Sequence, residues 1–289
     1  MLSSLARKIS QSNFVITAEV APPKGSGIDG LLKAAAFVAP HVDAVNVTDN
    51  QGATMRMSAL AAAAVLVREG IEPVLQLTCR DRNRLALQSD LLGAAALGIR
   101  NVLALTGDAI GCGDHRQGKA VFDLDSVSLL RTIKAMNSGH DLNGTPLEAA
   151  TAFYYGAAAA PEVEPFAVTL PKLAQKAEAG AGFFQTQAVF SPEKLAAFCE
   201  AVRPSGVTVI AGILVLRSAK MAEFINRNIP GLRVPETIVE RLRSADDPAA
   251  EGISIAADMA ARARSICGGI HIMSMGRDHV VPEIALAAS

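Results

Sequence analysis

Apolar residues gather in eight short runs along the chain, and most of these runs are rich in β-branched residues. The runs are FVITAEV (14–20), AVNVTD (44–49), PVLQLTC (73–79), NVLALTGD (101–108), AFYYGAA (152–158), FFQTQAV (183–189), TVIAGILV (208–215) and GIHIMSM (269–275). Runs of this length and composition predict buried β-strands.

Longer segments rich in Ala and Leu separate most of the runs and predict helices. They cover 29–40, 57–70, 85–98, 123–137, 168–180, 191–202 and 221–229. Gly70, Gly98 and Gly180 follow the last turn of three of them, as glycines at helix ends do. Because single helices between strands indicate parallel pairing, the pattern predicts an α/β fold, a single (β/α)8 TIM barrel over residues 1–289. A doubly wound sheet is the main alternative.

Three segments depart from this repeating unit. At the N-terminus, Leu2, Leu5 and Ile9 recur at helical spacing and predict a short helix that caps the barrel, with a targeting peptide as the alternative. Residues 107–125 form a long loop after the fourth strand, at the barrel end where TIM-barrel enzymes place their sites. Residues 231–252 predict an extra charged helix before the last helix and strand.

The composition excludes several classes of function. Lys and Arg number 27 against 28 Asp and Glu, without a basic run that would bind nucleic acid or an anionic membrane. The four cysteines lack the spacing of a zinc site or a disulfide framework, so we expect no metal and a reducing cytoplasm. No apolar run approaches the roughly 20 residues that span a bilayer.

Polar side chains stand at the carboxyl ends of the predicted strands, which meet at one mouth in a barrel. Glu19 ends the first strand directly before Pro22 and Pro23, and a buried charge is costly unless it is paired or used. The other strand ends supply Asn46, Thr48, Gln76, Thr78, Cys79, Thr106, Asp108, Gln185, Gln187, His271 and Ser274. Acids and amides of this kind hydrogen-bond a polar heteroaromatic ligand. The absence of lysine from these ends argues against a Schiff-base aldolase.

Motifs at these strand ends resemble those of the methylenetetrahydrofolate reductase family over nearly the whole chain. They are EVAPPK (19–24), NVTDNQG (46–52), LTC (77–79), LTGD (105–108), KAEAGA (176–181), QTQ (185–187) and GIL (212–214). The stretches 156–165 and 269–278 resemble the short branch of acetogenic and related bacteria. The resemblance implies a flavin-dependent oxidoreductase of one-carbon metabolism and methionine biosynthesis, which reduces 5,10-methylenetetrahydrofolate to 5-methyltetrahydrofolate.

The resemblance also implies roles for individual mouth residues. Glu19 matches the general acid that protonates N10 of the folate and opens the five-membered ring to an iminium. We expect burial in an apolar wall to favour the protonated form of this carboxyl group, whose pKa is ordinarily about 4.3. Asp108 matches the carboxylate that binds the pterin and lies near the flavin, and we count it as catalytic too. Gln187 matches a folate contact, and we expect Gln76 in the same substrate site.

For the cofactor, the resemblance implies FAD, with FMN as the alternative, lying across the barrel top. The residues expected to hold it are Thr48, Thr106, Asp108, Phe122, Asp125, Tyr155, Ala157 and Lys176. Two positions depart from the family pattern. Thr106 replaces an Arg that contacts the flavin in many members, and Ala219 replaces a Phe of the NADH-using branch. We therefore expect either NADH or a partner electron-transfer subunit as the donor, in a homo- or hetero-oligomer.

Three other interpretations stay open at this point. A pterin-binding methyltransferase barrel would bind methyl-folate and need no flavin. A flavin-free reductase is consistent with the missing Arg at Thr106. A subunit that binds folate or a partner, but has lost independent activity, is the third, and the intact set of Glu19, Asp108 and Gln187 argues against it.

Overall fold

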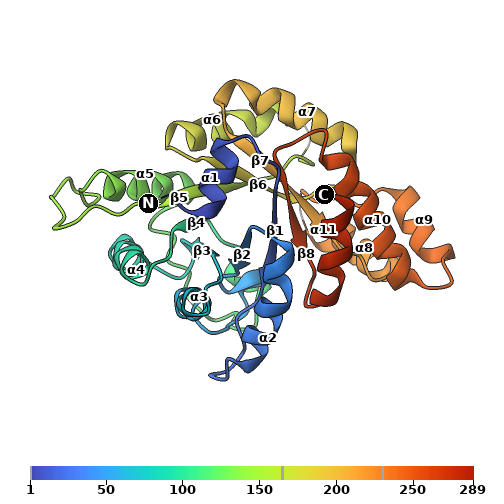
Figure 1. Ribbon diagram of the computed structural model, residues 1–289, viewed down its shortest axis with the longest axis horizontal. Helices are drawn as coiled ribbons and strands as arrows, with labels where there is room; N and C mark the ends of the chain where they lie inside the picture. Colours follow the sequence, from blue (N-terminus) through green and yellow to red (C-terminus); the bar gives the residue numbers. More distant parts are fainter. Residues whose placement is uncertain (1, 164–165, 230) are drawn as a thin grey trace.

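Eight parallel strands close into a barrel in the computed structural model, which describes residues 2–163, 166–229 and 231–289 (Figure 1). The strands are β1 (Val15–Val20), β2 (Ala44–Val47), β3 (Pro73–Thr78), β4 (Asn101–Leu105), β5 (Tyr154–Ala159), β6 (Phe183–Ala188), β7 (Thr208–Leu214) and β8 (Gly269–Met273). They follow chain order around the barrel, and β8 pairs with β1. The predicted (β/α)8 barrel is confirmed, and the doubly wound sheet is excluded.

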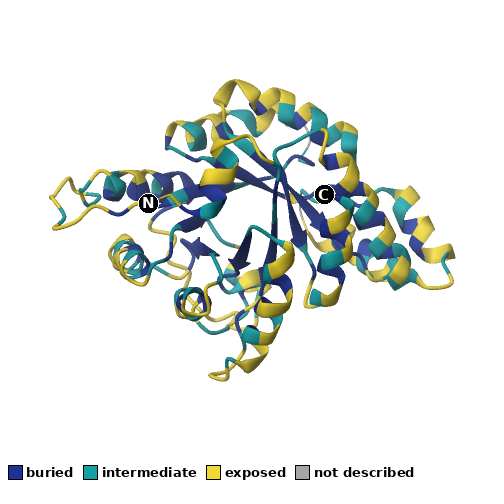
Figure 2. Ribbon diagram, viewed as in Figure 1, coloured by how far each residue is buried: buried dark blue, intermediate teal, exposed yellow. Residues whose placement is uncertain are grey.

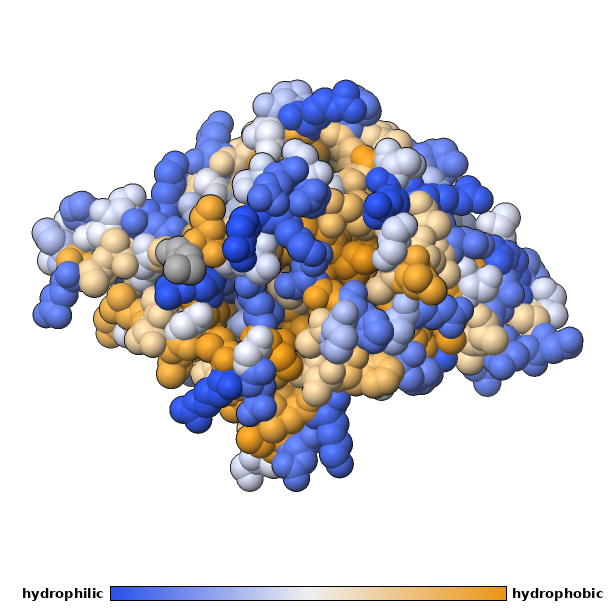
Figure 3. Space-filling model, in the orientation of Figure 1, coloured by the Kyte–Doolittle hydropathy of each residue, from blue (hydrophilic) through white to orange (hydrophobic). Residues whose placement is uncertain are grey.

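Helices surround the barrel. They are α2 (Asp29–Val38), α3 (Ala59–Arg68), α4 (Arg84–Ala96), α5 (Ser126–Asn137), α6 (Leu170–Glu178), α7 (Pro192–Val202), α8 (Ala219–Asn228), α9 (Glu236–Ser244), α10 (Pro248–Ala263) and α11 (Val281–Ala287). Figure 2 shows buried strands inside helices that bury one face and expose the other. Hydrophilic residues are spread over the helices on the face drawn in Figure 3, with apolar areas between them. No helix in the described part of the chain is long and apolar enough to cross a membrane.

The strands fill the two ends of the barrel differently. At the amino end, Val15, Val74, Phe183 and other apolar residues form a cluster inside the barrel. Higher up, the Nδ2 of Asn46 donates a hydrogen bond to Oε1 of Gln185 across 2.8 Å of the buried interior. Because side chains alternate along a strand, the intervening residues face the helices and build the main core. The carboxyl end is therefore left polar.

The predicted capping helix is confirmed as α1 (Ser4–Ser10). Leu5 is fully buried in the apolar cluster at the amino end of the barrel. The carboxylate of Glu72 accepts the backbone N–H groups of Ser4 and Leu5 at 2.8 and 2.9 Å, and the Asn101 amide at 3.0 Å. One acidic side chain thus fixes the helix to two strands. Leu2 precedes the helix and is 67% exposed, so its predicted place in the apolar stripe is wrong.

The two other predicted departures are also present. The segment 107–125 has one short 3-10 turn among its residues and folds back over the loop after β2. Its Asp114 bonds the Lys24 ammonium at 2.5 Å and the Met55 N–H at 3.0 Å. Gly113 permits the contact, since a Cβ there would lie 1.8 Å from the Ala53 carbonyl oxygen. The extra helix is α9, whereas α11 after β8 was not predicted.

Replacing Leu5 by Ala should lower the free energy of unfolding by about 2–5 kcal/mol, because it leaves a cavity under the barrel. Urea unfolding followed by circular dichroism measures the effect. Leu2→Ala is the matched control, since it shortens an exposed side chain nearby and should cost less than about 0.5 kcal/mol. Equal losses in the two variants would show that α1 does not cap the core.

Candidate active site

A cavity of about 630 Å³ opens at the carboxyl end of the barrel. This volume is typical of small-molecule sites. Its polar wall contains Glu19, Asp49, Gln76, Thr78, Arg80, Thr106, Asp108, Lys176, Gln185, Gln187 and His271. Its apolar wall comes from the end of β7, from α8 and the segment after it, and from the end of β8, and contains Leu214, Met221, Phe224, Ile225, Ile229, Leu232, Met273 and Met275. The two walls suit a ligand that has a hydrogen-bonding face and an apolar face.

Glu19 lies near the end of β1, with 8% of the residue exposed. Its Oε2 is 3.8 Å from Nε2 of His271, whose Nδ1 lies 2.9 Å from the Thr17 hydroxyl. The Thr17 hydroxyl donates to the Ile270 carbonyl at 3.4 Å. The Thr17 hydroxyl therefore holds Nδ1 of the ring in place, and Nε2 is the ring nitrogen that faces Glu19.

Sequence reasoning placed His271 at the mouth without giving it a role. The available signal was the pairing of the first and last strands in a closed barrel, which sets Thr17 beside His271.

A buried ion pair joins the ends of β2 and β3. Asp49 accepts the backbone N–H and the hydroxyl of Thr78, both at 2.9 Å, and pairs with Arg82 at 2.8 Å. Arg82 also pairs with Asp90 of α4 at 2.8 Å. Because all these donors hold the Asp49 carboxylate, its role here is to fix the two strand ends. Sequence reasoning missed this network.

Arg80 is a second cation that the sequence analysis did not single out. Its side chain is 1% exposed and bonds both carboxylate oxygens of Asp81, at 2.8 and 2.7 Å, and the Asn50 carbonyl at 3.2 Å. The hydrogen bond to Asp81 raises the pKa of Arg80, so its charge is secure. Nη1 has no hydrogen-bond partner among the described residues. The guanidinium adds positive charge below Asp108.

Asp108 follows a glycine that the packing requires. Gly107 has φ of +99°, and a Cβ there would lie 3.0 Å from Cβ of Arg80. The exposed Asp108 carboxylate accepts the backbone N–H of Gly52 at 3.1 Å. Asp108 also lines the large cavity.

The structure brings the four predicted substrate residues together. Glu19, Gln76, Asp108 and Gln187 all line the large cavity. Gln187 is exposed at the mouth, whereas Gln185 below it is buried and bound to the Asn46 amide. Donors and acceptors from four different strand ends thus converge on one volume.

Five of the eight predicted cofactor residues line the large cavity or the pocket beside it. Thr106, Asp108 and Lys176 line the large cavity. Phe122 and Asp125 line an adjoining shallow pocket that shares Thr106. These five residues therefore form one continuous surface that runs outward from the mouth.

Three predicted cofactor residues lie elsewhere. Tyr155 and Ala157 belong to the core between barrel and helices, and the Tyr155 hydroxyl donates to the Ala179 carbonyl at 3.3 Å. Strand alternation explains this placement, because Ala158 faces the cavity in their stead. Thr48 is fully buried outside the cavity lining, and its hydroxyl has no partner among the described residues.

Lys176 is a strongly perturbed group in the cavity wall. Its Nζ donates to the Ala158 carbonyl at 2.6 Å. Burial lowers its pKa to about 8, with a further lowering from Lys172 and an opposing effect of Asp125. Among the described residues, no group of three or more His, Cys, Asp or Glu is arranged to hold a metal ion.

The pKa of Lys176 predicts a pH dependence of stability. Between its folded value of about 8 and the ordinary value of 10.5, the unfolded chain binds more protons, so the free energy of unfolding rises with pH. Lys176→Met removes this contribution. In urea titrations, wild type should therefore gain stability relative to the variant from pH 8 to 10. The exposed Lys33→Met on α2 is the control, and a flat difference for Lys176→Met contradicts the assignment.

Comparisons with solved structures show the same fold. Tryptophan synthase from M. tuberculosis is 13% identical, with a TM-score of 0.55, covering 100% of this chain and 99% of that one. Oxaloacetate acetylhydrolase is 12% identical, with a TM-score of 0.53 and coverage of 94% and 80%. At these identities the likeness concerns the fold alone.

Comparisons of sequence are more specific. Methylenetetrahydrofolate reductase 2 of Schizosaccharomyces pombe is 28% identical over 274 residues, covering 87% of this chain and 41% of that protein. Probable methylenetetrahydrofolate reductase (NADPH) of Caenorhabditis elegans is 27% identical over 238 residues, covering 78% and 34%. The chain thus spans about two fifths or less of these relatives. Because the family model for methylenetetrahydrofolate reductase matches residues 4–288, the chain belongs to that family.

Proposed function

We propose that this chain reduces 5,10-methylenetetrahydrofolate to 5-methyltetrahydrofolate. The observation that carries the proposal is that Glu19, Asp108 and Gln187 line one cavity in a member of this family. Family membership favours this reaction over the pterin-binding methyltransferase, because the matching family model is that of a reductase and both relatives are named as reductases.

Glu19 is the general acid of the proposed reaction. Its proton goes to N10 of the folate, the bond from N10 to the methylene carbon breaks, and an iminium forms at N5. A hydride added to the methylene carbon completes the methyl group, so the reaction consumes one proton and one hydride. His271, whose Nε2 is 3.8 Å from Glu19, is placed to pass a proton to the carboxylate after turnover when Nε2 carries one.

In the proposed reaction, the polar wall of the cavity binds the pterin and the apolar wall excludes water. The Asp108 carboxylate accepts from N3–H and the 2-amino group of the pterin, a bidentate pairing that fixes the ring plane. Gln76 and Gln187 supply amide donors and acceptors around the same ring. The apolar side chains of α8, including Met221 and Phe224, exclude water that would otherwise attack the iminium.

A flavin, FAD or FMN, fits the continuous surface beside the substrate residues. Thr106, Asp108 and Lys176 would hold its ring, and Phe122 and Asp125 would lie toward its tail. A bound flavin supplies the hydride of the reaction. The negative charge of Asp108 lowers the reduction potential of such a ring and so favours hydride donation.

A flavin-free reductase, with hydride delivered directly by a nicotinamide, is the second candidate. It is favoured by the placement of Thr48, Tyr155 and Ala157 outside the cavity lining, and by the commitment of the Lys176 ammonium to the Ala158 carbonyl. The visible absorbance of the purified protein separates the two candidates. Three further points stay predictions: that NADH or a partner subunit supplies the electrons, that the protein forms an oligomer, and that it is located in the cytoplasm.

Glu19→Gln should lower the rate of folate reduction by about 10²- to 10⁴-fold, because a positioned acid contributes that much. Stopped-flow absorbance should show unchanged reduction of bound cofactor, or unchanged nicotinamide binding if no flavin is present. The exposed Glu69→Gln is the matched control and should keep full activity. Retention of folate reduction by Glu19→Gln would falsify the acid role.

A further inference from the structure

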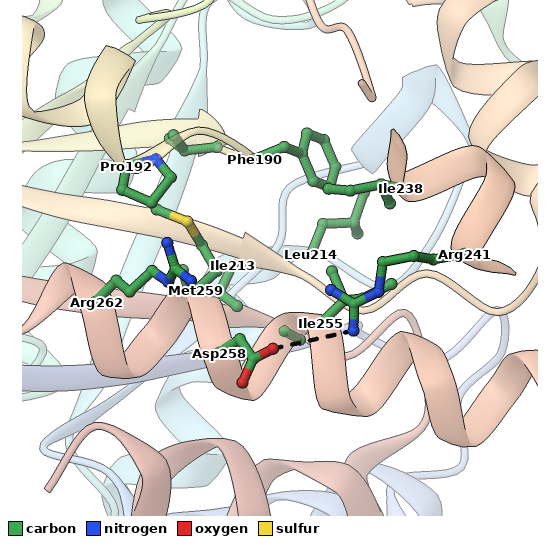
Figure 4. A pocket seen from close by; sticks show the side chains of 12 residues that line it. Phe190, Pro192, Ile213, Leu214, Ile238, Arg241, Ile255, Asp258, Met259 and Arg262 are labelled. Atoms are coloured by element: carbon green, nitrogen blue, oxygen red, sulfur yellow. Dashed lines mark ion pairs between the residues drawn. The ribbon is translucent and has the colours of Figure 1, made fainter. Parts of the chain in front are cut away.

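A second pocket, of about 180 Å³, lies outside the barrel between α7, α9 and α10 (Figure 4). Its lining is largely apolar and consists of Val189, Phe190, Pro192, Ile213, Leu214, Ile238, Ile255, Ala256 and Met259. Three charged residues complete it: Arg241 from α9, and Asp258 and Arg262 from α10. Figure 4 shows Phe190 and Ile238 on one side, with Asp258 and Arg262 on the other.

The charges on α10 do not neutralise each other. Asp258 and Arg262 are four residues apart, the spacing at which opposite charges on a helix normally pair. Asp258 instead points toward Arg241, at 4.0 Å, and remains 61% exposed. Arg241 is already held by Glu251 at 2.8 and 2.6 Å. The exposed Arg262 guanidinium makes no hydrogen bond or ion pair with the rest of the described chain. The pKa of Glu193 is lowered chiefly by the hydrogen bond from Ser191, and the nearby charge of Arg262 adds to this effect.

This pattern selects the chemistry of a ligand. A simple anion would meet the Asp258 carboxylate, and a simple cation would meet Arg262. A zwitterion satisfies both, because its carboxylate can pair with the guanidinium while its ammonium group pairs with Asp258. The remaining volume, equal to about six waters, is bounded by hydrocarbon and suits an apolar side chain.

We propose that this pocket binds a free α-amino acid with an apolar side chain. The carboxylate lies on Arg262, the ammonium group on Asp258, and the side chain against Ile213, Leu214 and Ile255. The binding itself does not depend on the reaction proposed above.

The pocket is mechanically connected to the active site. Leu214, at the end of β7, lines both this pocket and the large cavity. Helix α10 lies against the segment after β7 through Gly252, where a Cβ would come within 1.8 Å of the Leu216 carbonyl oxygen. The next residue, Arg217, lines the large cavity. A ligand bound between α10 and β7 therefore contacts a residue that also lines the large cavity. Any effect of this ligand on the rate of the reaction rests on the proposed function.

Isothermal titration calorimetry with L-leucine and L-methionine tests the binding. We expect saturable binding of at least one of them and none of glycine, which lacks the side chain. L-Leucine methyl ester lacks the carboxylate charge and 4-methyl-2-oxopentanoate lacks the ammonium group, so both should bind at least tenfold more weakly. Arg262→Gln and Asp258→Asn should each raise Kd about tenfold or more, since each removes a charge-assisted pair.

Two control variants locate the site. Arg131→Gln removes an exposed cation from α5 and should leave Kd unchanged. Glu19→Gln alters the large cavity and should also leave Kd unchanged, which keeps this test separate from that of the reductase. The proposal is overturned if neither amino acid binds, if Arg262→Gln binds as well as wild type, or if Glu19→Gln abolishes binding.

Discussion

The pairing of the last strand with the first is the constraint on which the rest of the molecule depends. It closes the sheet, so no strand edge is left for aggregation. Gly269 makes the closure tight, because a Cβ there would lie 2.5 Å from the Val15 carbonyl oxygen. The same register sets Thr17 opposite His271, and so gathers the groups around Glu19. The closed barrel and the grouping of Thr17 and His271 near Glu19 are therefore consequences of one ladder of hydrogen bonds.

The interior of the barrel becomes more polar from its amino end to its carboxyl end. Burial of these polar side chains is unfavourable, and hydrogen bonds and ion pairs between neighbours offset it. A buried polar group without a partner is destabilising by about 1–3 kcal/mol. The interior satisfies most of its polar groups in pairs, such as Asn46 with Gln185 and Asp49 with Arg82. Among the buried polar atoms of the described residues that lack a partner, Nη1 of Arg80 belongs to a residue in the wall of the large cavity, where a ligand can complete it.

The sequence predicted the barrel because strand and helix periods alternate clearly, and it predicted the mouth because strand ends are polar. It failed in β5, where YYGAAA has no polar alternation that would tell which of Tyr155 and Ala158 faces inward. It also missed pairs whose partners are distant in sequence, such as Thr17 with His271, which are 254 residues apart. Arg80 and Arg82 were not singled out, because the burial of a charged side chain depends on the packing of loops that are distant in sequence.

The apolar wall of the large cavity contains three thioethers, those of Met221, Met273 and Met275. Sulfur is polarisable and these side chains are flexible, so the wall can adapt to ligands of different outline. The same atoms accept oxygen, and a sulfoxide would turn a hydrocarbon surface into a polar one. Met275, 45% exposed at the rim, is the first that a peroxide reaches. Oxidation of these methionines would therefore admit water to the cavity, although its acid and amide side chains would be chemically unchanged.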